Sequence, residues 1–363
     1  MAKERKVALI HDWLTGMRGG EKVLEILCEL YPDAPIYTLV HERGKVSPII
    51  ERHKIITSFL QKMPYATTRY QYYLPLFPTA IEQFDLSEFD LVISSSHAAA
   101  KGVRVKPGAT HVCYCYTPMR YIWDQFDNYF GSGRSSLLAR LGMKFFRLHL
   151  QKWDVRSSKG VTQFIAISET VRERIQRIYT RESIIIYPPV DINRFAVSEK
   201  DDGYFLIVSA LVPYKRIDIA VDAFNKIGKP LRIIGTGSEM ARLKKIEGKN
   251  ISFEGWQSDE RIAEAYAGCT ALIFPGEEDF GIVPVEAMAS GKPVIAFGKG
   301  GVSETVVDGR TGILFPEQSS SSLIAAVEKF QSMKFDGKVI REHTMRFDRA
   351  KFTSAIQNYL DTP

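Results

Sequence analysis

The chain has 363 residues, more than a single hydrophobic core usually serves, and this length favours two domains of about 150 to 200 residues each. Hydrophobic residues make up 45% and charged residues 25% of the sequence, which excludes a disordered or fibrous chain. The net charge of +6 favours an anionic ligand over a cationic partner, and no paired-cysteine finger, RNP-like aromatic run or long Lys/Arg block points to nucleic acid.

The N-terminal half predicts alternating strands and helices. Residues 6–10 are typical of a buried strand, and the glycine-rich turn 15–20 leads into a helix that places Val23, Leu24, Leu27 and Leu30 on one face. Further strands are predicted at 35–40, 90–94, 110–116 and 163–167. Strands that alternate with helices indicate a parallel sheet covered on both faces.

A second series of strands follows a predicted linker at 187–193 and 198–203. Its strands are expected at 204–209, 231–234, 251–253, 271–274, 294–296 and 312–314, with helices at 217–227 and 259–267 among them. We therefore predict an α/β protein with two doubly wound, Rossmann-like parallel-sheet domains that face a central cleft. The predicted domains are 1–187 and 188–345, followed by a C-terminal segment 346–363 with a predicted helix at 347–360.

No run of 18 or more nearly uncharged apolar residues is present, and residues 1–5 lead directly into a strand rather than a signal core. We expect a cytoplasmic protein. Its four cysteines, Cys28, Cys113, Cys115 and Cys269, are too scattered for a disulfide framework, so we expect buried, reduced thiols.

Candidate ligand-binding residues lie just after predicted strands, where open parallel sheets bind their ligands. Gly235 and Gly237 follow the strand 231–234 and precede a helix that should begin near Ser238, so their amides could approach a phosphate. A short glycine turn of this kind is also common where the chain simply bends tightly.

The segment 275–287, after the strand 271–274, is more specific. Pro284 suits the first turn of a helix, which places Glu278 in the preceding loop and Glu286 early in the helix. The amides of Phe280 and Gly281 lie between these carboxylates, so the segment offers acceptors for hydroxyls and donors for phosphate. Glu286 could instead only complement the helix dipole, but it interrupts an otherwise apolar stretch.

With these residues the sequence resembles the retaining glycosyltransferases of family four with the GT-B fold, whose mark is two glutamates separated by seven residues, as Glu278 and Glu286 are. The resemblance covers nearly the whole chain. It implies that the domain 1–187 binds the acceptor, that the domain 188–345 binds the nucleotide sugar, and that the helix at 347–360 returns to the first domain. It includes the glycines of the first turn, the segments 210–215 and 235–237, and the segment 300–304. The segments 11–14 and 116–124 look most like the branch that contains bacterial surface-polysaccharide mannosyltransferases.

The resemblance implies a role for each matching residue. Glu278 would hold donor-sugar hydroxyls, Glu286 the ribose and Lys215 the diphosphate, with Lys215, Glu278 and His97 as the catalytic set. Other donor contacts would come from Gly19 or Gly20, from Gly235 and Gly237, and from the amides of Phe280, Gly281 and Ile282. A cation and a helix N-terminus near the diphosphate would stabilise the charge that develops on the leaving group.

Two positions depart from the family's pattern. Ala210 stands where an arginine is common, so one diphosphate cation is missing unless Arg216 or Arg18 replaces it. Tyr116 stands where a histidine is usual, which leaves His97 as the candidate for contacting the donor sugar.

No Asp-x-Asp motif occurs, and no His, Cys and carboxylate cluster has metal-ligand spacing. We therefore expect no cofactor and no metal requirement. The expected function is transfer of a hexose, with mannose from GDP-mannose as the first choice, to a saccharide or lipid-linked saccharide acceptor in surface-polysaccharide biosynthesis. The resemblance implies that the departing phosphate accepts the proton of the acceptor hydroxyl on the same face of the sugar.

Two other functions stay open. An epimerase acting on a sugar nucleotide would need an acid and a base on either side of the sugar ring, and no such pair is evident. A non-catalytic nucleotide-sugar-binding protein would explain Ala210 and Tyr116, but not the intact glutamate pair and Lys215. Basic and aromatic residues at 52–84 and 137–153 add the hypothesis of peripheral contact with an anionic membrane at its inner face. Core packing with a solvated edge is the alternative for both segments.

Overall fold

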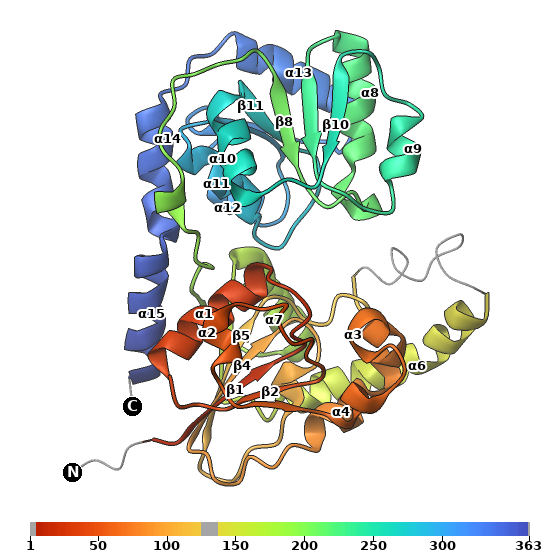
Figure 1. Ribbon diagram of the computed structural model, residues 1–363, viewed down its shortest axis with the longest axis vertical. Helices are drawn as coiled ribbons and strands as arrows, with labels where there is room; N and C mark the ends of the chain where they lie inside the picture. Colours follow the sequence, from red (N-terminus) through yellow and green to blue (C-terminus); the bar gives the residue numbers. More distant parts are fainter. Residues whose placement is uncertain (1–4, 125–136, 362–363) are drawn as a thin grey trace. The chain divides into compact units, whose positions relative to one another are not determined.

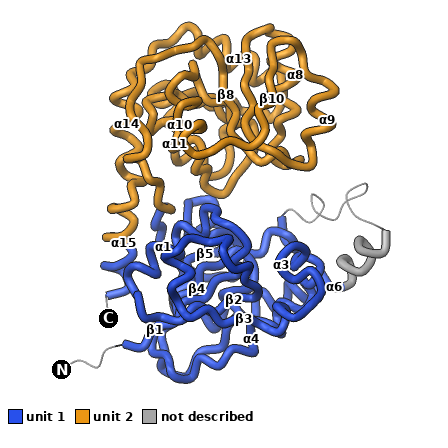
Figure 2. The backbone as a smooth tube through the Cα atoms, viewed as in Figure 1, with its two compact units in different colours: residues 1–187, 356–363 blue, residues 188–355 orange. Residues whose placement is uncertain are grey.

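The chain divides into two compact units, which Figure 2 shows in different colours. Unit 1 comprises residues 1–187 and 356–363, and unit 2 comprises residues 188–355. The structure is a computed structural model that describes residues 5–124 and 137–361, and the side chains of 137–145 lie outside that description. The last helix, α15 (Arg349–Asp361), starts in unit 2 and ends in unit 1.

Unit 1 is built on a seven-stranded parallel sheet in the order β3-β2-β1-β4-β5-β6-β7 (Figure 1). The strands are β1 (Val7–His11), β2 (Ile36–Thr38), β3 (Ile55–Thr57), β4 (Leu91–Ser96), β5 (Thr110–Cys115), β6 (Gln163–Ala166) and β7 (Ser183–Ile185). Its α-helices are α1 (Gly19–Leu30), α2 (Pro48–Glu51), α3 (Ala66–Arg69), α4 (Phe77–Glu82), α6 (Leu137–Ser158) and α7 (Glu169–Tyr179). Within the described part of unit 1, three 3-10 helices also cover the sheet, η1 (Phe59–Lys62), η2 (Tyr70–Leu76) and η3 (Ala100–Gly102).

Unit 2 repeats this design with six parallel strands in the order β10-β9-β8-β11-β12-β13. The strands are β8 (Phe205–Val208), β9 (Leu231–Ile234), β10 (Ile251–Gly255), β11 (Ala271–Phe274), β12 (Val294–Phe297) and β13 (Gly312–Phe315). The helices include α8 (Ile217–Ile227), α9 (Met240–Lys244), α10 (Asp259–Gly268), α11 (Ile282–Ala289), α12 (Val302–Thr305), α13 (Ser320–Gln331) and α14 (Gly337–Thr344).

Two Rossmann-like α/β units with parallel sheets confirm the predicted fold class. The central strands β1, β4, β11 and β12 are almost completely buried because helices cover both faces of each sheet, as parallel sheets require. The sequence prediction missed β3 and β7, since three residues are too few to show a period and both strands lie at a sheet edge. The helix after Gly237 begins at Met240, two residues later than predicted.

Several side chains of the basic and aromatic segment 52–84 belong to the core of unit 1. Tyr70 and Phe77 are buried and pack with Trp13 and Trp153, whereas Tyr65 and Tyr72 are exposed. In the other such segment, Arg140, Lys144 and Phe145 lie outside the described side chains. All four cysteines are buried and free of disulfides, as predicted. Among the described helices, none combines the length and apolar character needed to cross a membrane.

Candidate active site

In both sheets the strand order reverses at one point, and the loops that follow the two strands at this reversal run in opposite directions. Such a reversal is where doubly wound sheets bind their ligands. In unit 2 the reversal lies between β8 and β11, which are followed by the loops that carry Lys215 and Glu278. In unit 1 it lies between β1 and β4, followed by the glycine turn and by His97.

The reversal in unit 2 brings Lys215 and Glu278 into direct contact. Lys215 ends the 3-10 helix η5 (Pro213–Lys215), and its Nζ pairs with Glu278 Oε1. The two side chains are 14% and 23% exposed, so the pair is partly shielded from water but open to a ligand. Two residues 63 positions apart thus present a cation and a carboxylate at one place.

Glycines hold the two loops at this close spacing. A Cβ on Gly276 would lie 3.0 Å from the Lys215 Cα, so the glycine lets the loop after β11 approach the Lys215 backbone. On the other side, Gly301 N donates to Glu278 O at 2.8 Å, and a Cβ on Gly300 would overlap that oxygen. Sequence analysis did not single out Gly276, whose signal was its position two residues after a buried strand.

Helix α11 begins beside Glu278. Gly281 is its N-cap, with φ of +87°, and offers no side-chain oxygen to the amides of the first turn, which starts at Ile282. The Phe280 ring is buried edge-on against Phe347, with 5.5 Å between ring centroids, so any ligand contact from Phe280 must come from its backbone. A helix start without a side-chain cap attracts anions such as phosphate.

Glu286 lies on α11 and accepts a hydrogen bond from a buried tyrosine. The Tyr266 hydroxyl of α10 donates to Glu286 Oε2 at 3.1 Å. Burial, together with the Glu286 charge, raises the pKa of Tyr266 well above its usual value, so the hydroxyl keeps its proton. Glu286 therefore has an orienting partner in addition to any role in the helix dipole.

Gly235 and Gly237 have a structural reason to be glycine. A Cβ on either would overlap a backbone oxygen, that of Ser209 or of Leu211, in the loop after β8. The Gly235 amide already donates to Gly255 O at 2.7 Å. Binding of a donor by these two glycines stays a prediction.

Arg216 follows Lys215 directly but has partners of its own. Its guanidinium lies 3.2 Å from Asp218 Oδ1 and 3.3 Å from Gln318 Oε1, and its backbone adopts a left-handed φ of +51°. Its predicted role as a second diphosphate cation would require it to leave or share these partners.

Trp256, which the sequence did not predict as a site residue, follows β10 at the same carboxyl edge of the unit 2 sheet. Trp256 is 77% exposed and sits in a short loop between Gly255 and Ser258. Ser258 caps α10 and Gly255 accepts the Gly235 amide, so both ends of the loop are fixed. The only sequence signal was a single tryptophan between a strand and a helix cap.

In unit 1, Asp12 organises the loop after β4. Its buried carboxylate accepts four backbone amides, at 2.7, 3.0, 2.6 and 2.8 Å from residues 97 to 100 in order. The same carboxylate lies 3.2 Å from the His97 Nδ1, and the His97 ring stands edge-on to Trp13 at 4.3 Å. Burial lowers the pKa of His97, although the charge of Asp12 acts in the opposite direction.

Tyr116 contacts the glycine turn of residues 15–20. Its hydroxyl donates to Gly20 O at 3.0 Å and lies 2.7 Å from Ser95 Oγ. The structure therefore brings Gly20 and Tyr116 together at the carboxyl edge of the unit 1 sheet, and His97 lies at the same edge, 6.0 Å from Tyr116 between ring centroids. Gly19, the first residue of α1, lies beside Gly20.

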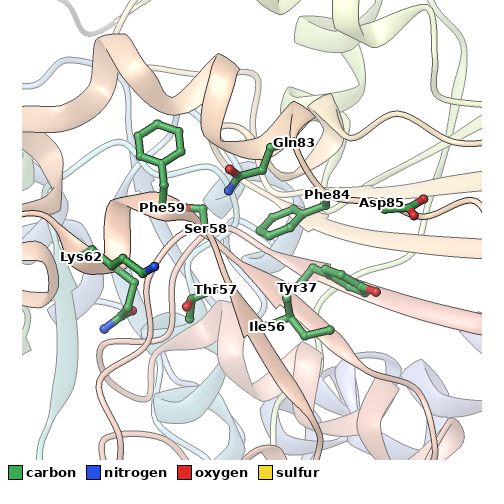
Figure 3. A pocket seen from close by; sticks show the side chains of 10 residues that line it. Tyr37, Ile56, Thr57, Ser58, Phe59, Lys62, Gln83, Phe84 and Asp85 are labelled. Atoms are coloured by element: carbon green, nitrogen blue, oxygen red, sulfur yellow. The ribbon is translucent and has the colours of Figure 1, made fainter.

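A separate pocket of about 550 Å³ lies in unit 1 (Figure 3). Its lining includes the aromatic rings of Tyr37, Phe59 and Phe84 and the side chains of Lys62 and Gln83. No residue of the predicted site lines this pocket. Among the residues that the structure describes, no three His, Cys, Asp or Glu side chains converge as a metal site would need.

Two Rossmann-like units with polar residues at each strand reversal define the class of fold found in GT-B glycosyltransferases. The chain is 18% identical to the lipopolysaccharide outer core galactosyltransferase WaaB over 98% of both chains, with a TM-score of 0.66. It is 19% identical to HepE of Anabaena, solved in complex with UDP and glucose, over 99% of this chain and 100% of that one, with a TM-score of 0.69. These similarities support the fold.

Residues 190–349, nearly all of unit 2, match the family of glycosyl transferases group 1. An uncharacterised glycosyltransferase of Methanocaldococcus jannaschii, MJ1178, is 28% identical over 54% of this chain and 58% of its own length. A GDP-mannose-dependent alpha-mannosyltransferase of Mycobacterium tuberculosis is 34% identical over 35% and 36%. The O-antigen chain mannosyltransferase RfbU of Salmonella typhimurium is 26% identical over 60% and 63%. The matches thus span about one third to two thirds of these relatives, and they support a transferase enzyme.

Proposed function

We propose that this protein is a retaining, metal-independent glycosyltransferase that binds a nucleotide-diphosphate sugar at the strand reversal of unit 2. The observation that carries the proposal is the contact of Lys215 with Glu278 beside the start of α11, within the region that matches glycosyl transferases group 1. A cation, a carboxylate and uncapped helix amides at one place suit a ligand that carries both phosphates and hydroxyls.

The chemistry follows from the charges at this site. The bond between the anomeric carbon and the phosphate oxygen breaks, and a bond to the acceptor hydroxyl oxygen forms on the same face of the sugar. The hydroxyl proton passes to the departing phosphate. Lys215 and the α11 amides stabilise the negative charge on the leaving diphosphate, which is the charge that grows as the bond breaks. In the structure the Glu278 carboxylate pairs with Lys215. When the donor is bound, Glu278 contacts the sugar hydroxyls as well.

We assign the nucleotide base to Trp256. The order β10-β9-β8-β11 puts the loop of Trp256 three strand spacings, about 14 Å, from the loop of Glu278 along the same sheet edge. A donor that lies along this edge would place its sugar near Glu278, its ribose near Glu286 and its base against the exposed indole. Stacking of a base on an aromatic ring contributes about 1 to 3 kcal/mol.

Mannose from GDP-mannose is the donor we propose first, because two of the relatives are named as mannosyltransferases. The proposed acceptor is a saccharide or lipid-linked saccharide in surface-polysaccharide assembly. Peripheral contact with an anionic membrane would suit such an acceptor. Exposed Tyr65 and Tyr72, with the Arg69 guanidinium 5.1 Å from the Tyr65 ring, are the residues we assign to this contact.

The test is donor consumption in EDTA with GDP-mannose, UDP-glucose and UDP-N-acetylglucosamine, each with and without lipid-linked saccharide acceptors. We expect one donor to be consumed, only with acceptor, and the proton NMR spectrum of the product to show the anomeric configuration of the donor. Consumption without acceptor that converts one sugar nucleotide into another would identify an epimerase. Binding without consumption of any donor would identify a non-catalytic protein, and restoration of activity only by Mg²⁺ would contradict metal independence.

Lys226→Ala is the matched control for Lys215→Ala, because Lys226 pairs with Asp222 on the exposed side of α8. We expect Lys215→Ala to abolish turnover and Lys226→Ala to leave it unchanged. For the base, Trp256→Ala should weaken GDP binding about tenfold or more, and the tryptophan fluorescence of the wild type should fall when GDP binds. Equal GDP affinity in both proteins would remove Trp256 from the site without affecting the assignment of Lys215.

A further inference from the structure

Hydrogen-bond directions around Tyr116 determine where the protons lie at the carboxyl edge of the unit 1 sheet. The Gly20 carbonyl can only accept, so the single hydroxyl proton of Tyr116 is used in that bond. Burial raises the pKa of Tyr116 well above its usual value, so this proton is retained. Ser95 must therefore donate its own proton to the Tyr116 oxygen, 2.7 Å away.

His11 is the register partner of Ser95 across β1 and β4 and continues this chain of hydrogen bonds. Ser95 has given its proton to Tyr116, so its oxygen can only accept from His11 Nδ1, which lies 3.1 Å away. His11 therefore carries a proton on Nδ1. The chain of hydrogen bonds runs in one direction, from the imidazole through Ser95 and Tyr116 to the Gly20 carbonyl.

The other ring nitrogen of His11 faces a carboxylate. His11 Nε2 is buried without a hydrogen-bond partner and lies 3.7 Å from Glu21 Oε1, and neither side chain is more than 4% exposed. An unprotonated Nε2 would place its lone pair opposite the carboxylate oxygen of Glu21, which is also an acceptor, in surroundings that screen charge poorly. A proton on Nε2 converts this repulsion into the attraction of an imidazolium for a carboxylate.

Glu21 is in the state that such a pair requires. Its Oε2 accepts the Arg18 amide at 3.0 Å, as a carboxylate at the start of α1 should. Burial raises the pKa of Glu21, but His11, backbone hydrogen bonding and the charge of His97 together lower it by more, so the net shift is downward. Asp12, the other carboxylate at this edge, is already engaged by four amides and by His97.

We propose that His11 and Glu21 form a buried imidazolium–carboxylate pair that positions the first turn of α1. Glu21 ties this turn to β1 through His11, and Tyr116 ties Gly20 to β4 and β5 through Ser95. The glycine turn is thereby held from two sides, at adjacent residues. This inference rests on the proposed function, because the family resemblance assigns Gly19 and Gly20 to the donor diphosphate. Glu21, His11 and Tyr116 are positioning residues in this account.

The pair also has other charged or titratable neighbours. His97 comes from the loop after β4, Asp12 follows β1 directly, and Arg120, after β5, acts on His97. A charged His11 must therefore be identified by its own signal rather than from a pH profile alone. The protein has seven histidines, few enough for assignment by single substitutions.

The first measurement is the nitrogen-15 spectrum of histidine-labelled wild-type protein at pH 7.5. We expect both ring nitrogens of His11 to show the chemical shifts of imidazolium, and in Glu21→Gln we expect a neutral ring protonated on Nδ1. A neutral His11 in the wild type would overturn the proposal. This readout needs no donor, so it stands even if no nucleotide sugar binds.

The second measurement is donor affinity and turnover. Glu21→Gln should raise the donor KM about tenfold with a smaller change in kcat. Tyr116→Phe keeps the His11–Glu21 pair but removes the hydrogen bond to Gly20, so it should raise the donor KM by less. The control is Glu51→Gln, which breaks the more exposed His41–Glu51 pair at 3.1 Å and should leave the donor KM unchanged. An unchanged KM in folded Glu21→Gln would refute the positioning role. Failure of the wild type to bind any donor would instead refute the proposed function.

Discussion

Replacing Gly300 by alanine tests whether the loop of Glu278 must be held from the side of β12. Gly300 has a φ of +76°, and a Cβ there would overlap the Glu278 carbonyl oxygen, which also accepts the Gly301 amide at 2.8 Å. Gly309 is a matched control, because it has the same φ of +76° but only the Met333 Cε, at 3.7 Å, near its Cβ position.

The two substitutions share one cost and differ in another. A non-glycine residue in the left-handed region costs about 1 to 2 kcal/mol, so Gly309→Ala should lower the free energy of unfolding by about that amount. Gly300→Ala adds the displacement of the Glu278 backbone and the loss of its hydrogen bond with Gly301, about 1 kcal/mol more before any strain is counted. The displacement also moves the Glu278 carboxylate away from Lys215.

Urea unfolding and donor titration together separate these effects. We expect Gly300→Ala to lose at least tenfold in donor affinity, which corresponds to about 1.4 kcal/mol, while Gly309→Ala keeps the wild-type affinity. Equal losses of stability in the two variants, or wild-type donor affinity in Gly300→Ala, would show that the close approach of Gly300 to Glu278 does not hold the site.

Three further predictions concern buried polar groups. Asp12→Asn should lower the free energy of unfolding by about 2 kcal/mol or more, because the new amide nitrogen would face backbone N–H donors where the carboxylate oxygen accepts them. Urea unfolding measures this loss, and an unchanged midpoint of the urea transition would contradict the role of Asp12. Because the pKa of Glu21 is lowered in the folded protein, the ionised side chain stabilises the fold above pH 4.5, its ordinary pKa. This contribution is lost as the pH falls through the lower pKa of the folded state. The stability difference between wild type and Glu21→Gln should thus shrink towards zero in acid, and a constant difference would argue against an ionised Glu21. Tyr266→Phe should weaken donor binding a few-fold in calorimetric titrations, because it removes the hydrogen bond that orients Glu286. Unchanged donor affinity would indicate that Glu286 does not contact the donor.

Glu278 was predicted from its loop after the buried strand 271–274, whereas Lys215 was predicted from the family resemblance. The segment 300–304 was part of the resemblance, but no sequence signal showed that Gly276 and Gly300 bring these two residues together. Gly276 and Gly300 matter through contacts with backbone atoms of distant segments, and a single glycine after a strand is too common to be a signal. The contacts became evident only when both loops were placed.

The polar chain of unit 1 shows the same limit. Asp12 meets its four amide donors 85 to 88 residues further along the chain, and no local pattern predicts such a pairing. Glu21 lies three residues after Arg18, which is the spacing of a capping box, but an arginine at the first position hides the motif. Tyr116 was identified as a departure from a family pattern, whereas its hydrogen bond to Gly20 gives it a structural role.

The most direct test of the central claim is calorimetric titration of GDP-mannose, UDP-glucose and UDP-N-acetylglucosamine into the wild type, Lys215→Ala and Glu286→Ala, all in EDTA. Glu264→Ala, which removes an exposed glutamate paired with Arg261, is the control for Glu286→Ala. The account predicts that one donor binds without metal, that Lys215→Ala and Glu286→Ala each weaken it at least tenfold, and that the control does not. Binding that survives both site substitutions, or no binding of any donor, would contradict the assignment of the donor site to the strand reversal of unit 2.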